Sequence, residues 1–496
     1  MRCSLSTLAL AAALTAQVAN AATPPTPAQF ARHAQTLLAE TYRTDAPGVA
    51  VLVMRGDEVL YRGARGEADV EADIPLTPDD RFRIGSVTKQ FGAAGLLTLV
   101  DAGKVALDDP LSKYLPNYPG GTRITVEHLL NHTSGIKSYT EIPGALQGPI
   151  QRDLTTLQLV DYFKNEAPDF APGDAWGYNN SGYVLVGAII EAASGEPWHQ
   201  YLEQALFTPL GMNDTGYGAD PAVIARQVKG YVTNGNAPAA PLPISMTQPH
   251  AAGALVSTVD DLARWNRGLH EGKVLHPATY ARMITPVGKA SDVGYGYGIW
   301  ISSVRGTPSL EHSGGIPGFD SHLTYLPGAG ITVAVLRNSE TRETQLIARR
   351  LAAVALGDPY PALKPVVVDV AVLEQYEGVY RVDERATRTL RVIDGMLTVQ
   401  RTDQPREQLT AIADDTFLYP DGFNRLQMER DASGKVTGMR FFSEGEGEGI
   451  VAIRESRTLW IVIAVVAALG VFLAVLLARR AARNRPPLRR RLYDTR

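Results

Sequence analysis

The spacing of apolar and polar residues divides the chain into segments of different structure. A capping-box pattern that begins at Thr26 predicts a helix running to about Tyr42. The apolar runs 49–53 and 59–61 flank a polar Arg-Gly-Asp-Glu sequence and predict a β-hairpin. Residues from about 85 to 285 are mostly helical in pattern and are joined by long loops.

Strand patterns return in the second half of the chain. Short β-rich runs separated by glycine and proline predict strands at 295–304, 310–312, 322–325 and 331–336, and a helix follows at 343–356. Combined with the N-terminal helix and hairpin, this order predicts an α+β domain over residues 22–356 whose antiparallel sheet is assembled from both chain ends. The Pro-, Ala- and Asn-rich stretch 234–249 predicts a loop long enough to bind or gate a ligand.

The C-terminal part of the chain changes in character. Residues 357–367 have the composition of a linker. From 368 to 457 the sequence alternates short strands with turns at 394–395 and 433–434, which predicts a small all-β meander or barrel.

The two chain ends carry targeting patterns. Residues 1–21 combine Arg2, an apolar run and an Ala-Asn-Ala exit, which is typical of a cleaved signal peptide. Residues 458–478 are 21 residues without a charge, and a helix of this length spans about 31 Å, enough for one transmembrane helix. The arginine-rich tail 479–496 follows, and by the positive-inside rule it stays in the cytoplasm while residues 22–457 lie outside.

Charge and cysteine count exclude several classes of protein. The 496-residue chain has a net charge of -4, the tail carries +7 and the signal peptide +1, so the exported part carries -12 and is not expected to bind nucleic acid. Cys3 is the one cysteine and leaves with the signal peptide, which excludes disulfides and multi-cysteine metal sites. His128 and His132 have a spacing compatible with a metal on a helix, yet no adjacent carboxylate completes a zinc-protease motif. We therefore expect no metal and no cofactor.

A Ser-x-x-Lys sequence at a helix start supplies the strongest candidate for catalysis. Ser86 and Lys89 are three residues apart and so lie on one helix face, where the amine reaches the hydroxyl. A hydroxyl beside a proton acceptor is what nucleophilic catalysis needs, and apolar surroundings would lower the lysine pKa enough for it to act as a base.

Two further segments add complementary groups. Tyr178 and Asn180 lie in a glycine-rich loop before an apolar helix and offer a phenol as proton shuttle and an amide as substrate clamp. His312, Gly314 and Gly315 lie at the end of a predicted strand, where glycines permit close backbone approach and N–H groups could face an oxyanion.

The ordered set Ser-x-x-Lys, Tyr-x-Asn and His-x-Gly resembles the penicillin-binding-protein and class C β-lactamase superfamily of serine hydrolases. The resemblance covers about residues 28–356 and includes the motifs at 129–135 and 209–212. It implies a β-lactamase/transpeptidase-like fold with a helical subdomain, and residues 368–457 resemble the small lipocalin-like domain of some relatives. The implied roles are nucleophile for Ser86, general acid and base for Lys89 and Tyr178, substrate binding for Asn180, His312 and Gly314, and an oxyanion hole formed by the N–H groups of Ser86 and Gly315.

The histidine in the third motif is a departure that bears on the substrate. Most family members carry a lysine there, whereas His312 is mostly neutral at pH 7 and supplies no fixed charge for a carboxylate. We therefore expect a membrane-anchored extracytoplasmic hydrolase, periplasmic in a Gram-negative cell, that cleaves amide or ester bonds of D-amino-acid-containing peptides. The alternatives are a β-lactamase or short-chain carboxylesterase with a β-lactam or ester substrate, and a non-turnover acylated sensor or ligand-binding protein. The sequence does not fix the oligomeric state.

Overall fold

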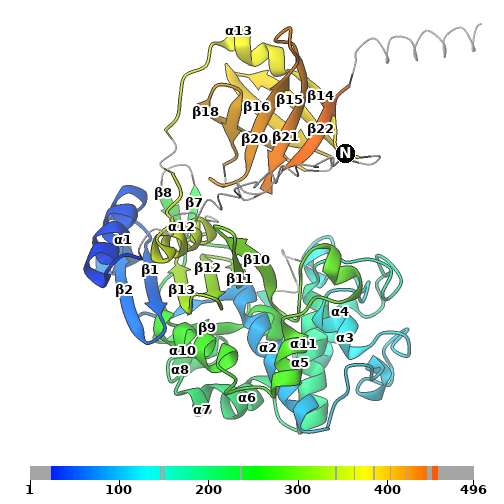
Figure 1. The fold of residues 1–496 in the computed structure, drawn as a ribbon. Helices are drawn as coiled ribbons and strands as arrows, with labels where there is room; N and C mark the ends of the chain where they lie inside the picture. The colour runs from blue at the N-terminus through cyan, green and yellow to red at the C-terminus, as the bar shows by residue number, and fades with distance from the viewer. Residues whose placement is uncertain are drawn as a thin grey trace, which may run out of the picture. The chain divides into compact units, whose positions relative to one another are not determined.

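The computed structural model describes residues 24–455 except 146, 147, 149, 150, 235, 236, 341, 342, 362, 363, 384, 385, 403, 421 and 444–448. The chain forms two compact units that divide between Pro361 and Ala362. Figure 1 shows each unit as a ribbon. The predicted signal peptide at 1–21, the transmembrane helix at 458–478 and the tail at 479–496 lie outside the described residues. Among the residues that are described, no helix is both long and apolar enough to cross a bilayer.

The first unit is built on a six-stranded antiparallel sheet in the order β10-β11-β12-β13-β1-β2. Its strands are β1 (Val49–Arg55), β2 (Glu58–Arg65), β10 (Trp300–Val304), β11 (Thr307–Ile316), β12 (Phe319–Leu326) and β13 (Ile331–Arg337). β1 pairs with β13 along its full length, from Val49 opposite Arg337 to Arg55 opposite Ile331. The prediction of one sheet assembled from both chain ends is confirmed.

Two helices cover one face of this sheet (Figure 1). α1 (Pro27–Thr41) begins at the predicted capping box, in which Thr26 and Gln29 exchange hydrogen bonds. It packs beside α12 (Thr344–Leu356). The two helices bury Phe30 and Leu351 against the side chains of β1 and β13 that point toward the helices. α12 ends at Gly357, whose φ of 82° closes the helix in the left-handed region.

The helical part of the chain packs on the opposite face and holds the larger core. Its longest helices are α2 (Thr88–Asp101), α5 (Asn180–Ser194) and α10 (Val259–His270). Its shorter ones are α3 (Val126–Leu130), α4 (Thr156–Phe163), α6 (Trp198–Leu202), α7 (Thr208–Leu210), α8 (Pro221–Ile224), α9 (His250–Gly253) and α11 (Pro277–Met283). Phe91 of α2 stacks on Trp265 of α10 with ring centroids 4.1 Å apart, and the Trp265 indole N–H donates to Gln90 at 2.9 Å. α2 is therefore fixed deep in the core, with almost all of its side chains buried.

Short strands lie among these helices. They are β3 (Glu67–Asp69) with β4 (Ile74–Pro75), the three-stranded β5 (Phe82–Arg83), β9 (Leu255–Ser257) and β6 (Gly216–Tyr217), and the hairpin β7 (Val232–Asn234) with β8 (Ala237–Ala239). The segment predicted as a loop at 234–249 thus begins inside a hairpin, in which Val232–Asn234 pairs with Ala237–Ala239. Residues 240–249 have no helix or strand.

The second unit is a nine-stranded antiparallel sheet in the order β17-β16-β15-β14-β22-β21-β20-β19-β18. The strands are β14 (Gly378–Arg381), β15 (Thr387–Ile393), β16 (Met396–Arg401), β17 (Arg406–Gln408), β18 (Thr410–Ala413), β19 (Thr416–Leu418), β20 (Arg425–Arg430), β21 (Val436–Phe442) and β22 (Ile450–Arg454), preceded by α13 (Val370–Leu373). The two edge strands β17 and β18 are consecutive in the chain, so the sheet curls into a nearly closed barrel. Asp394 and Gly395, with φ of 51° and 77°, form the predicted turn between β15 and β16. The all-β prediction is confirmed.

Candidate active site

Ser86 lies in a short 3-10 turn, η1 (Gly85–Val87), that leads directly into α2. β11 packs its backbone against this turn: a Cβ added to Gly314 would lie 2.1 Å from the Ile84 carbonyl oxygen and 2.9 Å from the Ser86 nitrogen. On the other side of the contact, the Ser321 hydroxyl donates to the Ile84 carbonyl at 2.8 Å. The glycine at 314 therefore allows the strand end to reach the turn, as the sequence predicted for this motif.

Lys89 is fully buried one turn further along, and its amine touches three oxygen atoms. Nζ lies 3.1 Å from Ser86 Oγ, 2.8 Å from Asn180 Oδ1 and 2.9 Å from the Ala252 carbonyl oxygen. The last two can only accept hydrogen bonds, whereas the serine hydroxyl can also donate. Nζ is placed to donate to all three oxygens, and a deprotonated amine can instead donate to Asn180 and Ala252 and accept from Ser86.

Burial supports the neutral form of this amine. The pKa of Lys89 is lowered well below its ordinary value because the side chain is desolvated. The three oxygens that it contacts include no carboxylate that would favour the charged form. The arrangement gives a proton acceptor in contact with a hydroxyl at the positive end of a helix.

Asn180 is held from several directions at the start of α5. Its side-chain Nδ2 donates to Thr140 Oγ1 at 3.2 Å, and its backbone N–H donates to Ser138 Oγ at 3.2 Å. The preceding Asn179 caps the helix by accepting from the Gly182 N–H at 2.7 Å. Asn180 therefore presents its carbonyl oxygen to Lys89 in a fixed orientation.

Tyr178 is positioned by a loop that the motif at 129–135 holds in place. His132 has a left-handed backbone with φ of 63°, its carbonyl oxygen accepts from the Gly177 N–H at 3.0 Å, and its Nδ1 accepts from the Asn179 N–H at 3.2 Å. The His132 ring lies 4.5 Å from the Tyr178 ring, centroid to centroid. Burial raises the pKa of the Tyr178 hydroxyl, and its interaction with the Ser86 side chain lowers the pKa by a smaller amount.

His312 lies on β11 and is almost completely buried. Nδ1 lies 2.6 Å from the Ser313 carbonyl oxygen, which can only accept, so the proton sits on Nδ1 and Nε2 accepts from the Tyr295 hydroxyl at 3.1 Å. Desolvation is the largest effect that lowers the pKa of His312, to about 3. The imidazole is thus neutral, and both of its nitrogens are hydrogen bonded within the protein.

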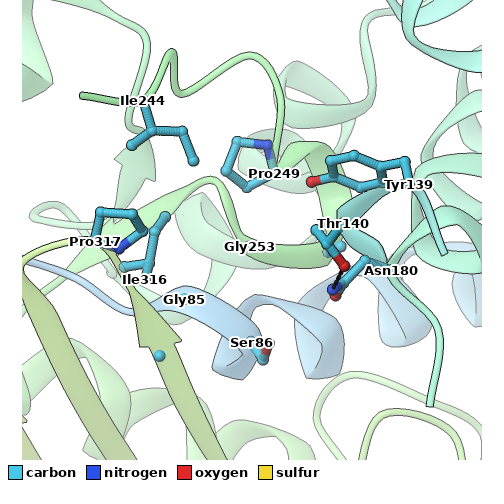
Figure 2. A pocket seen from close by; sticks show the side chains of 12 residues that line it. Gly85, Ser86, Tyr139, Thr140, Asn180, Ile244, Pro249, Gly253, Ile316 and Pro317 are labelled. Carbon is cyan, nitrogen blue, oxygen red and sulfur yellow. Dashed lines mark hydrogen bonds between the residues drawn. The ribbon is translucent and has the colours of Figure 1, made fainter. Parts of the chain in front are cut away.

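A cleft of about 540 Å³, part of it open to solvent, lies in front of Ser86 (Figure 2). Its lining residues are Gly85, Ser86, Tyr139, Thr140, Asn180, Ile244, Pro249, Ala252, Gly253, Gly315, Ile316 and Pro317. None of these twelve side chains carries a charge. Figure 2 shows Ser86 and Asn180 on the cleft wall, with Ile244 and Pro249 facing them across the opening.

The structure brings most of the predicted site residues together. Lys89 contacts Ser86, Asn180 and the Tyr178 ring, and Tyr178 interacts with Ser86. Gly315 lines the cleft, whereas His312 and Gly314 do not. Sequence reasoning missed the hydroxyls of Ser138 and Thr140 that orient Asn180, the Ala252 carbonyl, and the apolar wall at Ile316 and Pro317. Ile244 and Pro249 belong to the stretch 234–249 that the sequence predicted to bind or gate a ligand. Ser138 and Thr140 directly follow the 129–135 motif, a signal that could have found them, while a backbone carbonyl such as that of Ala252 leaves none.

Comparisons with known proteins agree with this geometry. A family model described as beta-lactamase matches residues 29–357. The D-alanyl-D-alanine-carboxypeptidase/endopeptidase AmpH of Escherichia coli K12 is 30% identical over 355 residues, which cover 65% of this chain and 88% of that protein. Among solved structures, the D-amino acid amidase from Ochrobactrum anthropi SV3 complexed with D-phenylalanine is 27% identical with a TM-score of 0.59, covering 66% of this chain and 98% of that one. The octameric penicillin-binding protein homologue from Pyrococcus abyssi is 26% identical with a TM-score of 0.62 over 86% of this chain and 98% of that one.

Proposed function

Since this chain belongs to the beta-lactamase family and is a serine hydrolase, we propose that Ser86 is its nucleophile and that it hydrolyses amide or ester bonds of D-amino-acid-containing peptides. The contact between Ser86 Oγ and the buried amine of Lys89, at 3.1 Å, carries the assignment of the nucleophile. The D-amino-acid part of the proposal is supported by the names of the relatives, which include a D-amino acid amidase and a D-alanyl-D-alanine-carboxypeptidase.

The opposite pKa shifts of two neighbouring groups suggest how they divide the proton transfers. Lys89 has a lowered pKa and is suited to accept a proton, while Tyr178 has a raised pKa and stays a phenol that donates one. In the proposed acylation, Ser86 Oγ attacks the scissile carbonyl and its proton passes to Lys89. Backbone N–H groups of Ser86 and Gly315 stabilise the oxyanion. When the bond to the leaving group breaks, Tyr178 protonates the departing amine or alkoxide and regains a proton from Lys89.

Deacylation follows the same route with water as the nucleophile. Water attacks the ester carbonyl while Lys89 accepts its proton, the bond to Ser86 Oγ breaks, and the serine recovers its hydrogen. The result is one carboxylic acid and one amine or alcohol per water consumed, with Ser86, Lys89 and Tyr178 back in their starting states.

The uncharged cleft supports amide and ester substrates over substrates that present a carboxylate. A bound carboxylate without a cationic partner loses much of its hydration and gains no ion pair in return. None of the twelve lining side chains is cationic, and His312, which takes the place of the family's lysine, is neutral and buried. We infer that a penicillin carboxylate or a free peptide C-terminus is poorly accommodated.

A substrate panel tests the proposal. The purified protein and its Ser86→Ala variant are assayed against D-aminoacyl amides, short-chain esters, D-Ala-D-Ala peptides and nitrocefin. We expect hydrolysis of the amides or esters that depends on Ser86 and exceeds that of the carboxylate-bearing substrates. A preference for nitrocefin would contradict the substrate assignment, and residual hydrolysis in the alanine variant would contradict the nucleophile. Stable labelling by a fluorophosphonate without turnover of any substrate would favour an acylated sensor.

We also propose that the enzyme is exported and anchored in the cytoplasmic membrane with its catalytic unit outside. The support is the signal pattern at 1–21, the 21 uncharged residues at 458–478 and the arginine-rich tail after them. Protease treatment of intact spheroplasts tests this topology: the catalytic unit should be digested, while a tag placed after residue 496 should be protected. A catalytic unit that is protected in intact spheroplasts would contradict it.

A further inference from the structure

Three aromatic side chains gather around the buried ring of Tyr295. Trp176, Tyr178 and Trp300 are each partly exposed, and the buried Tyr295 packs between them. Centroid distances from the Tyr295 ring are 6.0 Å to Trp176, 6.4 Å to Tyr178 and 4.8 Å to Trp300, and the two tryptophans lie 5.5 Å apart. We call Trp176, Tyr178 and Trp300 the aromatic surface.

The aromatic surface is separate from the cleft in front of Ser86. The cleft is lined through Asn180 and apolar side chains such as Ile244 and Ile316, and none of the three aromatic residues lines it. The Tyr178 ring nevertheless lies 4.8 Å from Lys89 Nζ, which contacts Ser86, and Tyr178 also interacts with the Ser86 side chain. One member of the aromatic surface therefore lies at the nucleophile. The cleft and the aromatic surface therefore differ in composition. A hydrolase must bind both halves of its substrate, the acyl group and the leaving group.

The position of the proton donor indicates which half lies where. A general acid must be within hydrogen-bond reach of the atom that it protonates, which here is the nitrogen or oxygen of the leaving group. If Tyr178 is that acid, the leaving group departs over Tyr178, whose ring packs on the same Tyr295 that contacts Trp176 and Trp300. The acyl group then occupies the cleft next to Asn180.

We propose that the aromatic surface is the leaving-group subsite and that it selects uncharged amine or alcohol leaving groups that carry an aromatic ring. This inference deepens the proposed function and rests on it. Aromatic rings favour edge-to-face and offset contacts with one another, and the tryptophans offer both faces and edges. His312, the basic residue of the third motif, is buried and hydrogen bonded to Tyr295. It therefore offers no positive charge to a free carboxylate on the leaving group.

Two esters of the same acyl group separate the subsite from the rest of the site. D-alanine benzyl ester and D-alanine ethyl ester share the acyl half and differ in the ring of the leaving alcohol. We expect Trp300→Leu and Trp176→Leu to lower kcat/KM for the benzyl ester by roughly two- to tenfold relative to the ethyl ester. Trp300→Phe keeps a ring and should retain most of the preference.

The controls distinguish a subsite from a general disturbance. Tyr162→Leu removes a partly exposed aromatic ring on α4, which lies outside both surfaces, and should change neither ester. Thermal unfolding of each variant checks that it folds. An equal loss for both esters in the two leucine variants, or no loss for either, would overturn the leaving-group subsite while leaving the proposed function intact. Absence of Ser86-dependent hydrolysis of both esters by the unmodified enzyme would overturn the proposed function and this inference with it.

Discussion

Replacing Lys89 by methionine tests whether the buried amine is neutral in the folded protein. Methionine has a similar length and no ionisable group, so the variant keeps most of the apolar contact within α2 while removing the titration. Lys89 is fully buried and contacts the Ser86 hydroxyl, the Asn180 amide oxygen and the Ala252 carbonyl. The variant therefore changes both the stability and the chemistry in ways that can be measured separately.

The expected effect on stability follows from proton linkage. In the unfolded chain the lysine titrates near its ordinary pKa of about 10.4, whereas burial lowers the pKa in the folded protein. Between the two pKa values the unfolded state holds a proton that the folded state lacks, so the free energy of unfolding rises with pH by about 1.4 kcal/mol per unit from this group. Below the folded pKa the group gives no slope, and above about 10.4 the slope disappears again.

The assay is urea unfolding of the unmodified enzyme and the Lys89→Met variant at pH 7, 8 and 9. If the folded pKa lies below 7, the unmodified enzyme should gain about 2.7 kcal/mol more than the variant between pH 7 and 9. Gln90→Met serves as the matched control, because Gln90 is a buried neighbour on the same helix whose loss removes the hydrogen bond to Trp265 but no titration. That control should be destabilised equally at each pH.

The outcome that refutes the reasoning is a parallel pH dependence of the unmodified enzyme and Lys89→Met. It would mean that the amine is protonated in the folded state and accepts nothing from Ser86. The activity gives an independent check, since loss of a general base costs about 10²–10⁴ in rate. A Lys89→Met enzyme with nearly full kcat would assign the base to another group.

Other substitutions test the neighbouring contacts. Gly314→Ala places a Cβ 2.1 Å from a backbone carbonyl oxygen and should destabilise the fold by about 1–3 kcal/mol, whereas Gly315→Ala meets nothing within 4 Å and should melt near the unmodified temperature; equal melting temperatures would contradict the close packing of β11 on the Ser86 turn. Because the pKa of His312 is about 3, the imidazole stays neutral from pH 5 to 9, so His312→Gln should leave the midpoints of the kcat/KM pH profile unchanged; a lost acidic limb would show that His312 titrates. Asn180→Ala removes the acceptor that orients Lys89 and should lower kcat/KM by roughly tenfold or more; an unchanged value would remove Asn180 from the site.

Local sequence signals were sufficient for the parts of the fold that depend on short-range physics. The capping box at Thr26 placed the start of α1, and the polar turn before Glu58 placed the first hairpin, because each depends on residues a few positions apart. The start of β7 before Asn234 was missed because the partner strand lies inside a segment whose proline and alanine content favours a loop. Only residues 310–312 of the long strand β11 were predicted, because the glycines that follow weaken the strand pattern. Pairing with β12 keeps these glycines in the strand.

The site shows a similar division between motifs and tertiary contacts. The pairing of Ser86 with Lys89 follows from helix geometry and was predictable from three residues of spacing. The burial of His312 was not, because it depends on Tyr295, seventeen residues away, whose hydroxyl occupies Nε2. A histidine at that position was expected to be mostly neutral from its ordinary pKa, and packing strengthens the effect by removing water from around the ring. In this family member, therefore, the third motif packs the backbone of Gly314 against the Ser86 turn and holds Tyr295 through His312. The positive charge that the family usually has at position 312 has no counterpart among the side chains that line the cleft.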